Sequence, residues 1–258
     1  MRVISFANHK GGTGKSTVTL NTAILLAQQF GKHVLMIDID PQGSLTGALL
    51  EANSNYLTLH TVLGEGDKGE LALADIIQPI EPNLFLAAGG AMLSRSEIGI
   101  ASRFNREYIL KNALALISAE FDITLIDCPP SLSLLTINAL TASDAVIIPT
   151  QPAAVDLRGT ALFLETLSEI TAQLNPQLQN LGLILTFHDA RYKHHQNAVD
   201  VIDANNLSIM GTIGRTVKVQ EATTDGNALH EYDPTNPQVA AFKKIATQVN
   251  AWLESEQR

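Results

Sequence analysis

Short apolar runs alternate with longer amphipathic stretches along the chain. Apolar, β-prone runs predict strands at 1–7, 32–39, 84–88, 122–126, 145–150, 181–187 and 208–213. Apolar residues at helical spacing predict helices at 16–30, 105–118, 157–174 and 238–253. Continuously apolar strands separated by helices are typical of a parallel sheet covered on both faces. The pattern predicts one α/β domain over 1–258, with a doubly wound, mostly parallel sheet.

Two segments refine this picture. The helix at 16–30 is expected to bury Val18, Leu20, Ala23, Ile24 and Ala27 and to end at Gly31, a plausible C-cap. Residues 51–80 contain several Gly and Asp, and predict only short helices and loops.

A glycine-rich segment, NHKGGTGKST at 8–17, joins the first strand to the first helix. Side chains at Gly11, Gly12 and Gly14 would block backbone N–H groups from converging on phosphate oxygens. Lys15 can supply charge to the β- and γ-phosphates, and the Ser16 hydroxyl can ligate Mg²⁺. The order strand, glycine loop, helix is the one that a phosphate site at a helix N-terminus requires. The segment predicts a P-loop.

The loop holds a second lysine, Lys10, which an ordinary phosphate loop does not need. It comes too early in the loop to wrap back easily onto its own nucleotide. A cation there can instead reach the nucleotide of a facing subunit. Lys10 therefore suggests a nucleotide sandwich dimer.

Three aspartates follow apolar strands. Asp38 and Asp40 lie at the C-terminal end of the strand at 32–39, and Asp127 directly follows the run at 122–126. Ligands bind at the carboxyl ends of strands in open parallel sheets, so these carboxylates can approach the phosphates. We expect Asp127 to hold Mg²⁺ directly or through water; of Asp38 and Asp40, one can position Mg²⁺ or its water and the other can orient the attacking water. The alternatives are that Asp38 and Asp40 cap the turn before Pro41 and that Asp127 caps the next helix.

Composition narrows the class of protein. The chain has no apolar run of 18 or more residues, so no membrane-spanning helix is expected. Its single cysteine, Cys128, excludes a disulfide within the chain and is expected to be a small packed residue. No signal peptide precedes the first strand, which suggests a cytoplasmic protein.

The formal net charge of −9 argues against a surface that is basic throughout, but not against a local basic patch. The main basic residues of the third quarter are Arg191, Lys193, Arg215 and Lys218. They form either a solvated face or a set of contacts to nucleic-acid phosphates.

The chain resembles the ParA/Soj branch of the deviant Walker A ATPases, which are relatives of MinD. The resemblance rests on four blocks, NHKGGTGKST at 8–17, VLMIDIDPQGSLT at 34–46, FDITLIDCPPSLSLLTINAL at 121–140 and ILTFHDAR at 184–191. Their order and spacing are specific, and they extend along nearly the whole chain.

The resemblance implies a slow ATPase that forms an ATP-bound homodimer and binds double-stranded DNA without sequence preference. A ParB-like or adaptor protein on a cargo would stimulate hydrolysis and release the ATPase from DNA. Such a cycle partitions plasmids or chromosomes, or spaces assemblies such as carboxysomes. It implies ATP and Mg²⁺ as cofactors and a nucleoid-associated location. No helix-turn-helix domain precedes the first strand, so binding to a specific operator is not expected.

The family's roles carry over residue by residue. Lys10 would act across the dimer, Asp40 would activate water, Asp127 would be the Walker B residue and Arg191 would contact DNA. The nucleotide would be held by Gly11, Gly12, Thr13, Gly14, Lys15, Ser16, Thr17 and Arg215. Arg215 follows Gly214, where relatives usually carry proline, so the adenine pocket or its rigidity is expected to differ.

Two other functions stay open. A MinD-like membrane cycle needs a C-terminal basic amphipathic helix. The helix at 238–253 has apolar residues at helical spacing, which core packing explains equally well, and Glu254 and Glu256 would repel anionic lipid. A metabolic P-loop enzyme would show turnover dependent on a small acceptor. One cysteine per chain argues against a shared iron–sulfur cluster in such an enzyme.

Overall fold

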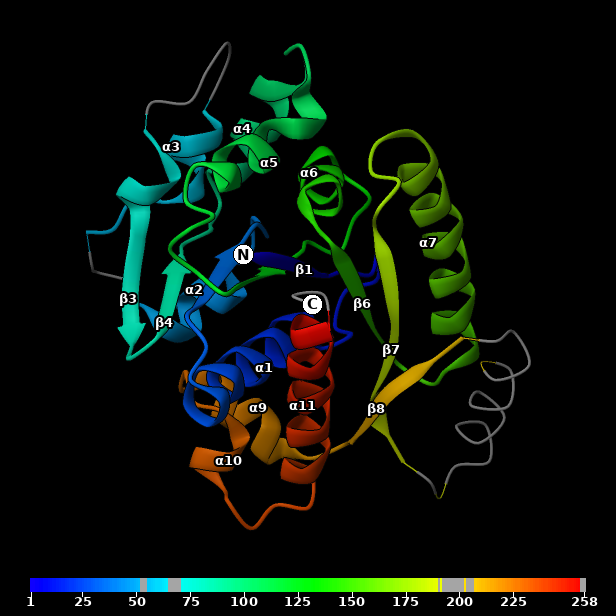
Figure 1. The fold of residues 1–258 in the computed structure, drawn as a ribbon. Helices are drawn as coiled ribbons and strands as arrows, with labels where there is room; N and C mark the ends of the chain where they lie inside the picture. Colours follow the sequence, from blue (N-terminus) through cyan, green and yellow to red (C-terminus); the bar gives the residue numbers. More distant parts are fainter. Residues whose placement is uncertain (52–54, 65–70, 190, 192–201, 203–206, 256–258) are drawn as a thin grey trace.

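The sheet of the protein has the strand order β3-β4-β2-β5-β1-β6-β7-β8 (Figure 1). A computed structural model describes all residues except 52–54, 65–70, 190, 192–201, 203–206 and 256–258. The strands are β1 (Arg2–Phe6), β2 (Val34–Asp38), β3 (Ile77–Glu81), β4 (Leu84–Ala87), β5 (Ile123–Asp127), β6 (Ala145–Thr150), β7 (Gln179–His188) and β8 (Ile209–Gly214). Neighbouring strands are parallel except β3, which runs antiparallel to β4 at the edge.

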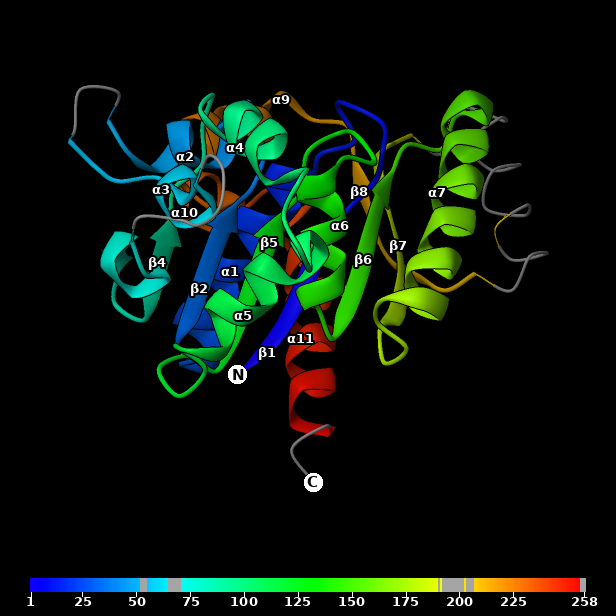
Figure 2. The same cartoon turned by 90° about the horizontal axis from the view of Figure 1, so that it is seen from above.

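Helices cover both faces of this sheet (Figures 1 and 2). One face carries α1 (Lys15–Phe30), α9 (Val217–Thr224), α10 (Leu229–Tyr232) and α11 (Val239–Ser255). The other carries α3 (Leu59–Leu63), α4 (Leu93–Ile100), α5 (Ile109–Ala115), α6 (Leu134–Ala142) and α7 (Ala154–Gln173). The short α2 (Ser44–Leu49) lies beyond the end of β2, and 3₁₀ turns occupy Leu73–Ile76 and Arg106–Tyr108.

Each central strand contributes to two cores, because successive side chains point to opposite faces. Ile4 and Phe6 of β1 pack with α1 and α11, whereas Val3 packs on the opposite side with α5, α6 and α7. Strands buried on both faces are therefore apolar throughout. This explains why the sequence shows continuous apolar runs rather than polar alternation.

The predicted doubly wound, mostly parallel sheet is confirmed, with all seven expected strands. The predicted buried residues of α1 are buried, and Gly31 caps this helix with a left-handed φ of 61°. The prediction for 51–80 was wrong in part, because it missed β3. The helix predicted at 105–118 is shorter, since it begins with a 3₁₀ turn and α5 ends at Ala115.

The sheet brings three chain segments together where the carboxyl ends of its central strands meet. In register, Phe6 of β1 and Asp38 of β2 both pair with Asp127 of β5. The glycine loop that follows β1 therefore begins beside the two aspartates that end the neighbouring strands. Ligands bind at the carboxyl ends of the strands in open parallel sheets.

Candidate nucleotide site

The glycine loop connects β1 to α1 and has two residues in left-handed conformations. Gly12 has a φ of 71°, and Gly14, the N-cap of α1, has a φ of 82°. A Cβ on Gly14 would also lie 3.4 Å from the side chain of Thr186 at the end of β7. The loop leads directly into the first turn of α1, whose free N–H groups and dipole favour a phosphate.

Lys15 lies inside this loop rather than in solvent. It is 6% exposed, and its Nζ donates a hydrogen bond to the Lys10 carbonyl at 3.2 Å. Burial lowers the pKa of Lys15, and the nearby carboxylate of Asp127 opposes that shift. The ammonium group is thus held at the loop, close to negative charge. Lys10 is half-buried, and its action on a facing subunit stays a prediction.

Asp127 is fully buried, and within the described part of the chain neither of its carboxylate oxygens has a hydrogen-bond partner. Burial, followed by the charge of Asp38, raises its pKa well above the ordinary value, while Ser16 and Lys15 act in the opposite direction. A buried carboxylate without a partner is costly, and a bound cation would satisfy it. The predicted Mg²⁺ fits here, with Ser16 beside it.

Protein side chains alone do not complete a metal site. Among the described residues, no three His, Cys, Asp or Glu side chains are grouped so that they could hold a metal ion. Mg²⁺ commonly binds through one or two carboxylates together with substrate phosphates and water. The donor set at Asp127 and Ser16 is therefore suited to Mg²⁺ that arrives with a nucleotide.

Asp38, the other predicted metal residue, has different surroundings. Its Oδ2 accepts hydrogen bonds from the Thr46 backbone and hydroxyl, both at 2.8 Å, and its Oδ1 accepts one from Asp40 N at 3.1 Å. Thr46 Oγ1 in turn accepts a hydrogen bond from Gly89 N at 2.8 Å. Asp38 thus fixes the start of α2. The geometry favours Asp127 as the metal ligand, and a metal role for Asp38 stays a prediction.

Asp40 lies in the turn between β2 and α2 and is 7% exposed. Its Oδ1 accepts a hydrogen bond from Gln42 N at 2.9 Å, and its carbonyl accepts one from Gly43 N at 2.9 Å. Asp40 therefore caps the turn around Pro41, as one of the two sequence alternatives expected. Its charge also acts on Lys15 and so lies close to the loop. A role toward water stays a prediction.

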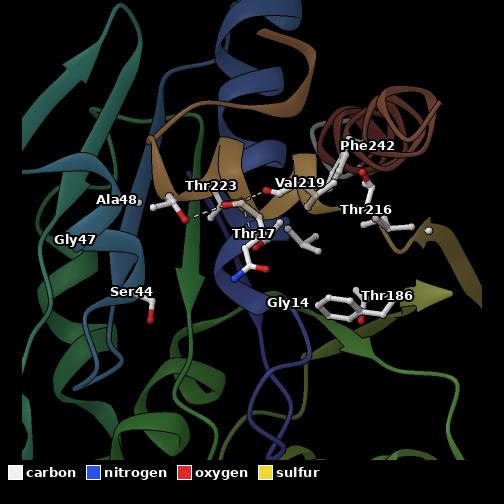
Figure 3. A pocket seen from close by; sticks show the side chains of 16 residues that line it. Gly14, Thr17, Ser44, Gly47, Ala48, Thr186, Thr216, Val219, Thr223 and Phe242 are labelled. Carbon is white, nitrogen blue, oxygen red and sulfur yellow. Dashed lines mark hydrogen bonds between the residues drawn. The ribbon is translucent and has the colours of Figure 1, made fainter. Parts of the chain in front are cut away.

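A cavity of about 360 Å³ opens beside Gly14 (Figure 3). Its walls come from α1, α2, α9, α11 and the ends of β7 and β8, and they include Val18, Phe187, Ile213, Val219 and Phe242. Two of its lining residues are joined by a hydrogen bond that the Thr223 hydroxyl donates to the Thr17 hydroxyl at 3.3 Å. Small-molecule sites are typically apolar clefts of about 300–1,000 Å³ with a few polar groups. This adenosine pocket, as we call it, therefore suits a nucleoside joined to a phosphate at the loop.

Arg215 lies next to this pocket, but its side chain lines another depression. This arginine depression, of about 410 Å³, is formed by His188, Asp189, Arg191, Thr212, Gly214, Arg215 and Gln238. It brings together two of the four predicted DNA-contacting residues. The contact of Arg215 with a nucleotide stays a prediction.

The other basic residues differ in their surroundings. Arg191 pairs with Asp189 at 2.6 Å, and its side chain is 86% exposed. Lys218 on α9 pairs with Glu221 at 2.9 Å and lies over the Tyr232 ring. Lys193 lies outside the described residues.

Two residues that the sequence did not single out hold the glycine loop. Thr186 Oγ1 donates a hydrogen bond to the Thr13 carbonyl at 2.9 Å, and Gln151 Nε2 donates one to the Gly12 carbonyl at 2.8 Å. Thr186 lies near the end of β7, and Gln151 directly follows β6. Polar residues at the carboxyl ends of apolar strands were the signal that could have found them.

Cys128 follows Asp127 and is fully buried. Burial, and then the charge of Asp127, raises the pKa of its thiol. A thiol that stays protonated is a poor nucleophile. The structure confirms that Cys128 is packed in the core. That it is unreactive stays a prediction.

Comparison with known proteins identifies the family. A family model described as an AAA domain matches residues 1–180. The chromosome partitioning protein ParA of Caulobacter vibrioides is 36% identical over 255 residues, which cover 96% of this chain and 94% of that protein. The chain belongs to the ParA/MinD family of P-loop ATPases.

Solved structures of the ParA/MinD fold are similar to nearly the whole of this chain. Cobyrinic acid a,c-diamide synthase from Mycobacterium smegmatis, with a bound ATP analogue and magnesium, is 32% identical with a TM-score of 0.85, covering 98% of this chain and 95% of that one. The ATP complex of a Cyanothece McdA variant is 25% identical with a TM-score of 0.87, covering 97% and 96%. Among the described residues, no helix has the length and apolar character needed to cross a membrane.

Proposed function

We propose that this ParA/MinD-family ATPase forms an ATP-bound dimer, binds DNA without sequence preference and positions a cargo. The observation that carries the nucleotide chemistry is the buried Asp127 carboxylate, which has no described hydrogen-bond partner and lies near Lys15 and Ser16. The cofactors proposed for this ATPase are ATP and Mg²⁺. Solved relatives that hold an ATP analogue with magnesium, or ATP, support this choice.

The chain's residues divide the work of hydrolysis. Bound Mg²⁺ supplies positive charge to the phosphates. Asp127 and Ser16 hold that ion, and the N–H groups of the loop with Lys15 hold the β- and γ-phosphates. Asp40 would orient the water that attacks the γ-phosphate. The adenosine pocket seats the base and fixes the position of the triphosphate.

Dimerisation completes the site. Lys10 is on the half-buried part of the loop, and we assign it to the nucleotide of the facing subunit. A second cation on the phosphates stabilises charge that develops during transfer. ATP, with its γ-phosphate, therefore favours the closed dimer, and hydrolysis releases it. Intrinsic turnover is slow because the composite site must close before Asp40 can act.

DNA binding belongs to the closed dimer. Arg191 and Arg215 line one depression in each subunit, and a dimer presents both twice. Doubling the patch matters, because affinity depends steeply on the number of phosphates neutralised. This compensates for a net charge of −9 per chain and makes nucleoid association depend on ATP. Lys193 and Lys218 belong to the same proposed surface.

A partner protein would connect the ATPase to its cargo. We assign stimulation of hydrolysis to a ParB-like or adaptor protein bound to a plasmid, a chromosome or a large assembly such as a carboxysome. The likeness to a chromosome partitioning ParA and to McdA supports this class of function. A stimulated dimer falls apart and leaves DNA, which produces directed movement or even spacing of the cargo.

Retention on nonspecific duplex DNA tests the proposal. Wild type and Asp40→Ala are measured with ATP, ADP and no nucleotide, alongside anionic liposomes. We expect retention on DNA only with ATP, and more in Asp40→Ala. Retention on liposomes alone would favour a membrane-cycling ATPase. Retention on neither, with ATP turnover that needs a small acceptor, would favour a metabolic enzyme.

A further inference from the structure

We propose that Gln238 is a positioning residue of the nucleotide site. Its side chain fixes the backbone of Gly214, the residue that the adenosine pocket and the arginine depression share. This rests on the proposed nucleotide-binding function. It assigns to Gln238, which precedes α11 and lies far along the chain from the glycine loop, a part in binding ATP.

The contact between the two residues is close and specific. Gly214 ends β8, and its N–H donates a hydrogen bond to Gln238 Oε1 at 2.6 Å. A Cβ on Gly214 would lie 2.7 Å from Gln238 Nε2, so the glutamine amide occupies the space beside this glycine. Gly214 is not among the glycines with positive φ. A larger residue at this position would therefore displace the Gln238 amide, for reasons of space rather than of backbone conformation.

The backbone of Gln238 is itself held by hydrogen bonds at the start of α11. Its N–H donates to Asn236 Oδ1 at 3.1 Å, and its carbonyl accepts from Ala241 N at 3.0 Å at the start of the helix. Phe242, in the first turn of α11, lines the adenosine pocket (Figure 3). The first turn of α11 therefore supports the pocket in two ways, through the Phe242 ring and through the Gln238–Gly214 hydrogen bond.

The hydrogen bond lies where it can affect the pocket wall. Arg215 and Thr216 directly follow Gly214, and Thr216 both lines the pocket and caps α9 through its side chain. Val219 and Thr223 of α9 line the same pocket. Arg215 N also donates to the His188 carbonyl at 3.3 Å, so without an acceptor at 238 the end of β8 loses one of the contacts that hold the chain on its way into α9. The pocket wall would then sample other positions, and binding would have to order it.

The chain provides a matched control in Gln248. This residue is on α11, and its Nε2 donates to the Met210 carbonyl of β8 at 2.7 Å. Met210 lines neither the adenosine pocket nor the arginine depression. Gln238, directly before α11, and Gln248, within it, therefore both hydrogen-bond to the backbone of β8, but only the bond of Gln238 is at the site.

The test compares four variants with wild type, Gln238→Met, Gln238→Asn, Gln238→Glu and Gln248→Met. Affinities for Mg·ATP and for ADP are measured by equilibrium binding, KM and kcat by steady-state hydrolysis, and stability by thermal unfolding. Met keeps the side-chain volume and removes the acceptor, Asn shortens the reach, and Glu keeps an acceptor oxygen. A lost neutral hydrogen bond is worth roughly 2- to 12-fold in affinity.

We expect Gln238→Met and Gln238→Asn to weaken both nucleotides about fivefold and raise KM with kcat unchanged. Gln238→Glu should stay within about twofold of wild type, and Gln248→Met should bind normally even if its unfolding temperature falls. Wild-type affinity in folded Gln238→Met and Gln238→Asn, or equal weakening in Gln248→Met, would overturn the role of Gln238. Failure of the wild type to bind ATP would instead overturn the proposed nucleotide site.

Discussion

Two aspartates that end neighbouring strands have opposite surroundings. Asp38 accepts three hydrogen bonds, from Asp40 N and from the backbone and hydroxyl of Thr46. Asp127 accepts none within the described residues, although both carboxylates are fully buried. The sequence places both at the edge where a ligand binds, but it cannot distinguish them. Two of the three hydrogen bonds that do so come from Thr46 of α2, a helix the sequence did not predict.

Burial of Asp38 predicts a pH dependence of stability. Burial raises its pKa from 3.8 to about 6, with the Thr46 hydrogen bonds opposing the shift. The native state therefore binds more protons than the unfolded state between these values, and this group's contribution to stability falls as pH rises through that window. We expect the unfolding free energy of wild type minus that of Asp38→Asn to be about 1 kcal/mol larger at pH 5 than at pH 7. Denaturant unfolding at both pH values measures it, and an unchanged difference would contradict the account.

The two loop lysines are expected to differ in effect. Lys15→Ala removes the cation inside the loop and should weaken Mg·ATP binding at least tenfold, because its charge meets the phosphates directly. Lys10→Ala should leave the affinity of a single chain within about threefold, because we assign Lys10 to the facing subunit. Nucleotide binding at protein concentrations below dimerisation distinguishes them. Equal losses in the two variants would refute the division of roles.

At the scale of elements, every strand of the sheet could be predicted except β3, one of its two edge strands. The seven expected strands have no polar face, because helices cover both of their sides. The missed strand, β3, reads IQPIE, and its residues are half-buried or exposed. Proline and polar residues suit an edge strand but hide it from a search for apolar runs. The short α2 and α10 likewise depend on tertiary contacts, because helices of one or two turns are marginal alone.

The chain at the end of β4 packs so closely against the end of β2 that one added methyl group should push the two apart. A Cβ on Gly89 would lie 2.3 Å from the Asp38 carbonyl oxygen, whereas a Cβ on Gly47 of α2 meets nothing within 4 Å. Gly89→Ala should therefore destabilise the protein by roughly 1–3 kcal/mol. Gly47→Ala should be neutral or stabilise it by up to about 1 kcal/mol. Urea unfolding of both variants checks the pair, and a neutral Gly89→Ala would show that this junction is loose.

At the scale of the molecule, α11 is part of the core. Phe242, Ile245, Val249 and Leu253 are buried against α1 and β8. The apolar face that could have served a membrane anchor is used in packing, which the helical spacing alone left undecided. Two of the residues proposed to contact DNA, Arg191 and Arg215, line the arginine depression near the carboxyl ends of β7 and β8.

The arginine depression predicts the salt dependence of DNA binding. The slope of log affinity against log salt changes by about 0.9 for each phosphate contact. A dimer presents each arginine twice, so Arg215→Ala should lower the slope by about 2 and weaken binding to any sequence alike. Arg106→Ala, in the 3₁₀ turn before α5 and outside the depression, should leave the slope unchanged. Titrations in ATP from about 50 to 300 mM salt measure this, and a slope unaffected by Arg215→Ala would place the DNA elsewhere.

The most direct test is the mass of the Asp40→Ala protein by sedimentation velocity with Mg·ATP, Mg·ADP and no nucleotide. The account predicts twice the 27.7 kDa of one chain with Mg·ATP only. It also predicts a monomer in all three conditions when Lys10→Ala is added, although that variant still binds nucleotide. A dimer that forms without ATP, or that survives the loss of Lys10, would contradict the claim that ATP joins two chains through this loop.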